Sequence, residues 1–411
     1  MPDTGDGAGW LKLYPLFRQI HSLSAWGGQN GANGVTHRQA IRPDMRCLTL
    51  EKRFMNQALE LPVSRRQVLL AGGVAAAPLL VPRVFAAQGK PDLVVVRGGK
   101  ELAPVEASYK RMKEGVQRLG GMASLVKGKR VLIKVNATEK TSQDANTSVP
   151  ATAALLRLVR ESGPADITVL GQEWGGFDSK RAGQPTLRQV IKQAKVKLIE
   201  LPHFWQKGSQ DQYKHCEVED DVWNQLWVAK RIFEPGTVLL NLARLKTHPH
   251  CVYTGCVKNV IGLTYRMYGF HKKDDVAVQK GDPANSDGWD VFPRKLGVAF
   301  RDVIGPRIAL NILDADQPTF GWRGPAPERI HTFPAHTTVL GSDALAMDVY
   351  GCGMLHEQRP KDFVTALGDW TVGESPYVLK NKPKANYLEI CGQLGTGQTD
   401  LKKVDIDEVS V

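Results

Sequence analysis

Residues 237–264 read TVLLNLARLKTHPHCVYTGCVKNVIGLT, and the other segments are best understood from this one. Its apolar run over 238–242 predicts a buried strand, and we expect that strand to deliver the following polar residues into a loop. A short helix closed by Gly262 should come next. The polar side chains between the two apolar segments are Lys246, His248, His250, Lys258 and Asn259. Their concentration predicts a functional site.

Upstream of this stretch, apolar runs alternate with helix-forming segments. The predicted strands cover 92–96, 129–135, 167–170 and 197–201. The predicted helices cover 104–119, 185–194 and a segment that is capped by residues 147–150, with Pro150 in the first turn, and runs through about 161. This alternation predicts an α/β fold with a parallel sheet. In parallel sheets, ligands bind beyond the carboxyl ends of the strands. Because Asn136, Glu173 and the 246–250 loop each follow a strand, we expect them to meet at one place.

The downstream part of the chain predicts a second α/β portion. A polar lid or linker over 265–290 separates it from the first, and the two portions would span 92–264 and 291–411. A helix over 292–303, strands over 307–312, 337–340 and 387–390, and a polar tail are expected. The predicted architecture is therefore two α/β halves with mainly parallel sheets and a ligand cleft between them. Asp314, after one strand, and Asp348, in a helix capped by Ser342 or Asp343, are candidate binding residues.

The beginning of the chain resembles an export signal. Residues 55–86 contain Arg65-Arg66, an apolar run of about 16 residues that is short of the ~20 a membrane-spanning helix needs, and a small-residue end at Ala86. This pattern predicts a twin-arginine signal peptide, the twin-arginine export machinery as a partner and a periplasmic or other extracytoplasmic location. No stable membrane span is expected after cleavage, although a buried hairpin or a membrane anchor is the alternative. Residues 1–54 are interpreted as disordered or as a mis-called start.

Composition narrows the classes of function. The chain has 411 residues, 42% of them hydrophobic, and a net charge of +12, of which the part after residue 86 carries +7. Because the positive charge is diffuse, it favours a small anionic ligand over nucleic acid. Five cysteines follow residue 86, at 216, 251, 256, 352 and 391, and an odd number leaves at least one unpaired in an oxidising compartment. Cys251 and Cys256 could pair, bind a metal or pack as apolar residues.

Three blocks of sequence resemble the family called domain of unknown function 362. They are NLARLKTHPHCVYTGCVKNVIGL, LNILDA with the later GWRGP, and LGSDALAMD, and the resemblance covers most of the chain from about 130 to 355. Many members of that family carry ferredoxin-like iron–sulfur motifs, which this sequence lacks.

A more distant resemblance is to lactate racemase and its relatives. That family binds a nickel pincer nucleotide between two α/β domains, with a strand-end histidine as acid/base and a lysine ten residues later that tethers the cofactor. His248 and Lys258 have this spacing, although Gly255-Cys256-Val257 replaces the expected Gly-Gly-Arg before the lysine. The resemblance implies a metal or a metal-containing nucleotide cofactor.

An enzyme is the first hypothesis for the site. His248, Lys246 and Lys258 would be catalytic, because a histidine exchanges protons near neutral pH and lysines fix an anion or form a covalent link. The reaction would be proton abstraction next to a carboxylate, of isomerase, racemase or oxidoreductase type. His248 and His250 could also bind one metal. The residues expected to bind substrate or cofactor are Asn136, Glu173, His250, Asn259, Asp314 and Asp348.

Two other hypotheses involve no chemistry. In the first, the protein is an exported binding protein that holds an anionic ligand with the same lysines. In the second, Lys258 and Asn259 only anchor a helix and the histidines are satisfied within a core. A carboxylate such as Glu173 or Asp348 within reach of His248 would favour the enzyme.

Overall fold

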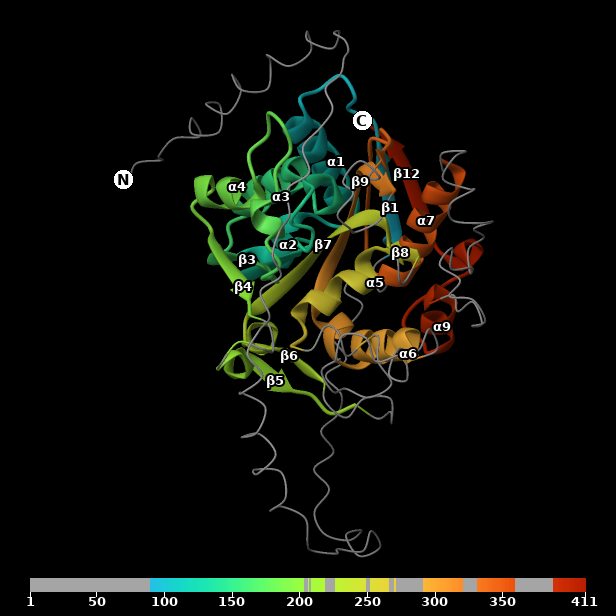
Figure 1. Cartoon of the computed structure of the whole chain (residues 1–411). Coiled ribbons are helices and arrows are strands. Elements are labelled where there is room, and N and C mark those ends of the chain that lie inside the picture. Colours follow the sequence, from blue (N-terminus) through green and yellow to red (C-terminus); the bar gives the residue numbers. More distant parts are fainter. Residues whose placement is uncertain are drawn as a thin grey trace, which may run out of the picture. The chain divides into compact units, whose positions relative to one another are not determined.

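A ten-stranded sheet organises the structure, with the strand order β12-β1-β11-β9-β7-β2-β3-β4 and with β8 and β10 paired to β7 and β9 (Figure 1). In this computed structural model the described residues are 89–202, 206, 208–218, 226–248, 252–265, 270, 291–320, 331–358 and 387–411. All of them belong to one unit within Leu80–Val411. The strands of the large sheet are β1 (Leu93–Arg97), β2 (Arg130–Val135), β3 (Asp166–Gln172), β4 (Lys197–Leu201), β7 (Thr237–His248), β8 (Val252–Thr254), β9 (Ile308–Phe320), β10 (His331–Thr332), β11 (Thr337–Gly341) and β12 (Ile406–Ser410).

Parallel pairing dominates the part of the sheet that matters for the site. Strands β4, β3, β2, β7 and β9 are parallel neighbours, and β1 is parallel to β12. Antiparallel pairs join β1 to β11, β11 to β9, β10 to β9 and β8 to β7. A separate two-stranded sheet is formed by β5 (Tyr213–His215) and β6 (Trp227–Ala229).

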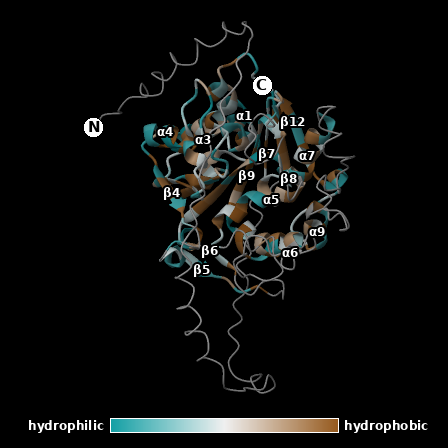
Figure 2. Cartoon of the chain, viewed as in Figure 1, coloured by the Kyte–Doolittle hydropathy of each residue, from teal (hydrophilic) through white to brown (hydrophobic). Residues whose placement is uncertain are grey.

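Helices cover both faces of the sheet. One face packs against α1 (Pro104–Arg118), α2 (Met122–Val126), α3 (Val149–Glu161) and α4 (Leu187–Gln193). The other packs against α5 (Cys256–Asn259), α6 (Val291–Val298), α7 (Ala344–Glu357) and α9 (Tyr387–Gln393). Because successive strand residues face opposite sides, buried strands must be apolar on both faces. Figure 2 shows the central strands coloured mainly as hydrophobic.

Two predicted helix starts are confirmed. The Ser148 side chain accepts a hydrogen bond from the Ala151 amide at the start of α3, and a proline occupies the first turn. The Asp343 carboxylate accepts from the amides of Leu345 and Ala346 at the start of α7. In both cases a short polar side chain satisfies amides that the first helical turn leaves without partners.

Several predicted elements differ from the structure. Lys246 and His248 are not in a loop, because β7 continues to His248 and pairs there with β8. Asp314 likewise lies inside β9 and not after a strand end. Residues 387–390, predicted as a strand, begin helix α9, and the predicted polar tail contains strand β12. The predicted helix over 292–303 is α6 followed by a π-helical segment, Ala299–Ile304.

The α/β class with a mainly parallel sheet is confirmed, but the two portions of sequence share that sheet. Strand β9, from the second portion, pairs with β7 from the first, and β1 lies between β11 and β12. The portions are therefore not halves with sheets of their own on either side of a cleft. The predicted segments 1–54 and 55–86, and nearly all of 265–290, lie outside the described residues. Among the described helices, none combines the length and apolar character that crossing a membrane requires.

Candidate functional site

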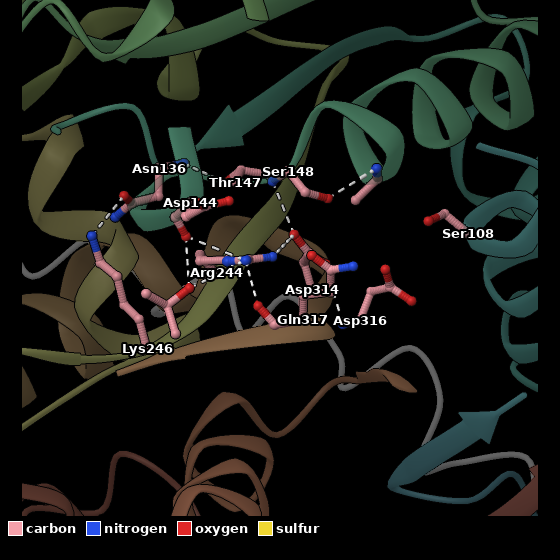
Figure 3. Close-up of polar contacts among 12 residues, drawn as sticks. Ser108, Asn136, Asp144, Thr147, Ser148, Arg244, Lys246, Asp314, Asp316 and Gln317 are labelled. Atoms are coloured by element: carbon pink, nitrogen blue, oxygen red, sulfur yellow. Dashed lines mark hydrogen bonds and ion pairs between the residues drawn. The ribbon is translucent and has the colours of Figure 1, made fainter. Parts of the chain in front are cut away.

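The candidate site lies at the carboxyl-end edge of the sheet, where β2 and β7 end beside the start of α3. Lys246, near the end of β7, is buried, and its ammonium donates to Asn136 Oδ1 at 3.3 Å and to the Ala145 carbonyl at 2.6 Å. Figure 3 shows this pair on one side of Arg244, with Asp314 and Asp316 on the other. The structure thus brings together two residues that the sequence places 110 positions apart.

The loop after β2 is tied down at this edge. The Asn136 amide donates to Thr147 Oγ1 at 2.8 Å, and the Thr147 amide donates back to the Asn136 carbonyl at 2.8 Å. The Thr147 hydroxyl in turn donates to the Leu242 carbonyl of β7 at 3.1 Å. Since these groups are buried and mutually bonded, the Asn136 backbone is linked through Thr147 to the backbone of the neighbouring strand.

Next to Lys246 along β7, Arg244 forms a buried ion pair. Arg244 Nη1 lies 3.0 Å from Asp314 Oδ2, and both side chains are 2% exposed. The same carboxylate oxygen accepts from the Ser148 amide at 2.9 Å, so it also holds the beginning of α3. Arg244 Nη2 donates to the carbonyls of Asp144 and Gln317. Asp314, predicted to bind a ligand, is therefore a partner of Arg244 and of the α3 terminus.

Further charged pairs surround this ion pair. Arg111 Nη2 lies 2.6 Å from Asp316 Oδ1, and Arg181 Nη1 lies 2.8 Å from Asp144 Oδ1. A pocket of about 40 Å³ opens among these groups, lined by Pro104, Gln143, Asp144, Ser148, Val149, Pro150, Arg181, Gln184, Arg244, Asp316 and Gln317. Its lining combines cationic and carboxylate side chains but does not include Lys246 or Asn136.

Some buried polar atoms at this edge have no hydrogen-bond partner in the described part of the chain. They include Arg244 Nε and Thr254 Oγ1. Thr254 of β8 is the register partner of Lys246, and Arg244 precedes Lys246 by two residues in β7. An unsatisfied buried polar group costs about 1–3 kcal/mol, so such groups in one place suggest a missing partner. A guanidinium Nε can only donate, so its missing partner would be an acceptor, whereas a hydroxyl can donate or accept. Gln172 Oε1, at the end of β3, is also unsatisfied and can only accept.

The helix that carries Lys258 packs on the other face of the sheet at the same edge. Lys258 is partly exposed, whereas its helical neighbours Val257 and Asn259 are buried. The Asn259 side chain donates to Asn241 Oδ1 at 2.8 Å and to the Leu242 carbonyl at 3.3 Å. Asn259 therefore anchors α5, as the structural hypothesis for this residue expected.

Asp348 is wholly buried in α7 and binds the start of α5. Its two oxygens accept from the amides of Cys256 and Val257, at 2.5 and 2.9 Å. Burial raises the pKa of Asp348 to about 7 against the opposing effect of these amides. Asp348 is thus occupied by backbone donors of α5.

Lys134 of β2 is a second buried ionisable group near α5. Its ammonium donates to Asn259 Oδ1 at 3.1 Å and to the Val135 carbonyl at 2.6 Å. Burial lowers the pKa of Lys134 to about 7, because desolvation disfavours the charged amine. Sequence reasoning did not single out this residue.

Comparison with known proteins adds a family. The model of the family described as domain of unknown function (DUF362) matches residues 131–353, which is more than half of the chain. The chain belongs to the DUF362 family. No curated protein matches it. A crystal structure of a Thermotoga maritima protein is similar to this DUF362 chain, at 14% sequence identity and a TM-score of 0.40 over 61% of this chain and 59% of the other. The chain thus spans less than two thirds of that protein's length.

The remaining predicted site residues of this DUF362 chain are less informative. Glu173 is exposed and accepts from Gln206 Nε2 at 2.8 Å. His248 ends β7, but its side chain, like the whole of His250, lies outside the described residues. Within the described part of the chain, no group of three or more His, Cys, Asp or Glu residues could hold a metal ion. The two histidines as metal ligands remain a prediction.

Sequence reasoning missed several residues of this DUF362 site. Arg244 and Lys134 each sit inside an apolar strand, and Thr254 lies in the short strand β8. A charged residue flanked by apolar residues in a strand predicted to be buried on both faces is the signal that could have identified the first two, because such a charge needs a partner.

Proposed function

We propose that this protein is an exported enzyme that binds a small anionic substrate at the carboxyl-end edge of the sheet and acts on it by proton transfer. The substrate's anionic group would lie among Lys246, Asn136 and Arg244. The reaction would be of isomerase or redox type. In the isomerase form, His248 takes the proton from the carbon next to a carboxylate and the proton returns to that carbon, so no further reactant is required.

The observation that carries the proposal is the set of donors gathered at this edge. The Lys246 ammonium and the unsatisfied Arg244 Nε and Thr254 Oγ1 come from adjoining positions of β7 and β8. Arg244 Nε and Thr254 Oγ1 lack a protein partner and fit an oxyanion, and the Lys246 ammonium, although bonded to Asn136 and Ala145, adds positive charge beside them. The position, beyond the ends of parallel strands, is where α/β sheets bind ligands.

A non-catalytic binding protein for an anionic small ligand is the second candidate. One observation favours it: Asp348, a carboxylate that would have oriented the catalytic histidine, is bound by the α5 amides. Glu173, the other such carboxylate, is exposed and bonded to Gln206. The described residues thus supply groups for binding more clearly than a general acid/base pair.

The experiment measures binding and exchange together. A panel of short 2-hydroxycarboxylates is titrated by calorimetry into the protein and into Lys246→Met, with Lys129→Met as the matched control. Lys129 is exposed just before β2, at the opposite edge of the sheet. We expect at least about a tenfold loss of affinity in Lys246→Met and none in the control. Equal affinity in both variants would refute the site.

Exchange in D₂O separates the two candidate functions. An enzyme should replace the hydrogen next to the carboxylate with deuterium, which NMR detects, and His248→Gln should abolish this replacement while binding persists. A binding protein should bind the same panel without exchange.

Export and a cofactor belong to the same proposal. Export through the twin-arginine route predicts that Arg65→Lys with Arg66→Lys leaves the protein in the cytoplasm, as cell fractionation would show.

The resemblance to lactate racemase extends the proposal to a metal-containing nucleotide bound near His248 and Lys258. Elemental analysis and intact mass of exported protein test this, because excess mass should be lost in Lys258→Ala. A metal-free protein of unmodified mass would remove the cofactor from the proposal.

A further inference from the structure

We propose that Asp348 and Lys134 are positioning residues that hold helix α5 from its two ends and thereby fix the position of Lys258. The idea that Lys258 then serves a bound anion rests on the proposed function, but the positioning itself does not. Helix α5 has four residues, of which Cys256, Val257 and Asn259 are buried. Lys258 is the partly exposed member of the helix.

A helix of this length cannot form by itself. Isolated helices shorter than about 12–15 residues are marginal in water, because closing the first turn fixes several residues for one hydrogen bond. The conformation of Cys256–Asn259 must therefore come from contacts outside the helix. The buried polar contacts at its two ends supply them.

The N-terminal end is held by Asp348. Each carboxylate oxygen accepts one of the first two helical amides, and the Tyr253 hydroxyl lies 3.4 Å from Oδ1. A Cβ added at Gly255 would lie 2.2 Å from Asp348 Oδ1, so the carboxylate reaches these amides only because residue 255 has no side chain. The close approach shows that α5 and α7 are fitted to each other at this contact.

The C-terminal end is held by Lys134 and a row of asparagines. Lys134 of β2, Asn241 of β7 and Asn311 of β9 are register neighbours across three strands. Asn241 Nδ2 donates to the Cys256 carbonyl at 2.9 Å and to Asn311 Oδ1 at 2.8 Å, while Asn259 bonds both Asn241 and Lys134. A Cβ at Gly262 would lie 2.8 Å from Lys134 Nζ, so the segment after α5 also packs on this ammonium.

Fixing a short helix through these contacts carries a desolvation penalty, because two ionisable groups are buried. Burying an ionisable group disfavours its charged form, and both pKa values are displaced toward neutrality, upward for Asp348 and downward for Lys134, each to about 7. Well-packed apolar residues could hold a helix without that penalty. What the polar contacts add is a defined position and rotation of α5, and hence of Lys258.

The same groups make the helix sensitive to pH near neutrality. The titratable groups that act on Asp348 are Tyr253, Cys256, Cys352, Cys391 and Asp343. Lys134 donates to the Asn259 side chain and lies beside Gly262. Since the pKa values of the surrounding thiols are raised by burial, Asp348 and Lys134 are the groups that change charge near pH 7.

The test measures the reactivity of Lys258 directly. The folded protein is acetylated with an N-hydroxysuccinimide ester, and peptide mass spectrometry gives the rate at Lys258 relative to exposed Lys129. In Asp348→Asn and Lys134→Met we expect this ratio to change by about threefold or more, because α5 is no longer fixed. Asp400→Asn is the matched control, since the exposed Asp400 also accepts a helix amide, but at the start of the 3₁₀ segment Leu401–Lys403.

The outcomes separate this inference from the proposed function. A changed ratio in the two positioning variants, with an unchanged ratio in Asp400→Asn, supports positioning even if no anion binds. An unchanged ratio in folded Asp348→Asn and Lys134→Met overturns it. If either variant does not fold, the wild-type ratio is followed from pH 5 to 9. An inflection near pH 7 supports the inference, and its absence overturns it.

Discussion

Asp314 is a residue whose substitution should strongly lower the free energy of unfolding. It neutralises Arg244 inside the protein and also holds the Ser148 amide, so Asp314→Asn leaves a buried guanidinium without its counter-charge. Breaking one side of a buried ion pair costs about 3–5 kcal/mol. We expect urea denaturation at pH 7 to show a loss of this size. The control is Asp178→Asn, because the exposed Asp178 pairs with Arg188 on the surface. This substitution should lower the free energy of unfolding by about 1 kcal/mol or less. Equal losses would contradict this account of Arg244.

Lys134 predicts a pH dependence of stability. Its pKa is lowered from 10.5 to about 7 in the folded protein, so between these values the unfolded chain binds more protons. The free energy of unfolding contributed by this group therefore rises with pH from about 7 to about 10.5, and the full penalty is present below pH 7. In Lys134→Met that rise should disappear from denaturation curves measured between pH 7 and 10. A rise of the same size in the variant would exclude Lys134 as its source.

Individual residues were predictable where position in the chain implies position in space. Lys246 and Asn136 could be paired because each follows the apolar run of a parallel strand. Lys134 and Arg244 could not be recognised as readily, because the sequence KRVLIKV or NLARL shows a charge without showing what neutralises it. The partners of Arg244 lie in β9 and in the loop before α3, 70 or more residues away. Asp348 was expected at the ligand and instead binds α5.

At the scale of elements, the start of α3 is the part of the site most easily tested. The Ser148 hydroxyl caps the helix, and substitution of an N-cap serine by alanine costs about 0.5–2 kcal/mol. We expect Ser148→Ala to lose about 1 kcal/mol in thermal or urea denaturation. Ser162→Ala, at the other end of the same helix, removes a hydroxyl that bonds the Leu158 carbonyl and should cost less. The reverse order would argue against the cap.

The helices and strands were predictable to the extent that local periodicity determines them. Strands β2, β3 and β4 and helices α1, α3 and α4 follow their apolar patterns closely. Residues 387–390 did not, because YLEI fits an alternating strand as well as a helix. In the structure Leu388 and Cys391 are both buried and three residues apart, which is helical spacing. The continuation of β7 to His248 depends on pairing with β8, and local sequence does not reveal that pairing.

At the scale of the whole molecule, the sequence predicted two halves and the structure has one shared sheet. Local patterns identify strands but not their neighbours, and the pairings of β1 with β11 and β12 join segments at opposite ends of the described chain. The polar stretch after residue 264 looked like a boundary between domains. That stretch separates β7 from β9 in the sequence, yet the two strands are parallel neighbours in the sheet.

Strand β12 (Ile406–Ser410) is structurally important because it covers one side of β1. Strand β12 pairs with β1 over five positions. Deleting residues 405–411 would leave β1 at the edge of the sheet with its hydrogen-bonding groups exposed, which favours association between molecules. We expect the deletion variant to unfold at a lower urea concentration and to form oligomers detectable by light scattering. A monomeric variant with an unchanged midpoint would show that β12 is dispensable.

The place of β1 in the sheet also has a consequence for synthesis. The Asp405 amide bonds the Asp92 carboxylate, 313 residues earlier in the chain. At about 5–20 residues per second on the ribosome, the apolar strand that follows Asp92 emerges roughly 15–60 s before its last partner exists. During that interval its LVVV sequence is free to meet other nascent chains. Until β12 has been synthesised, β1 lacks one of its two neighbours in the sheet, and an unpaired apolar strand is prone to pair with other chains.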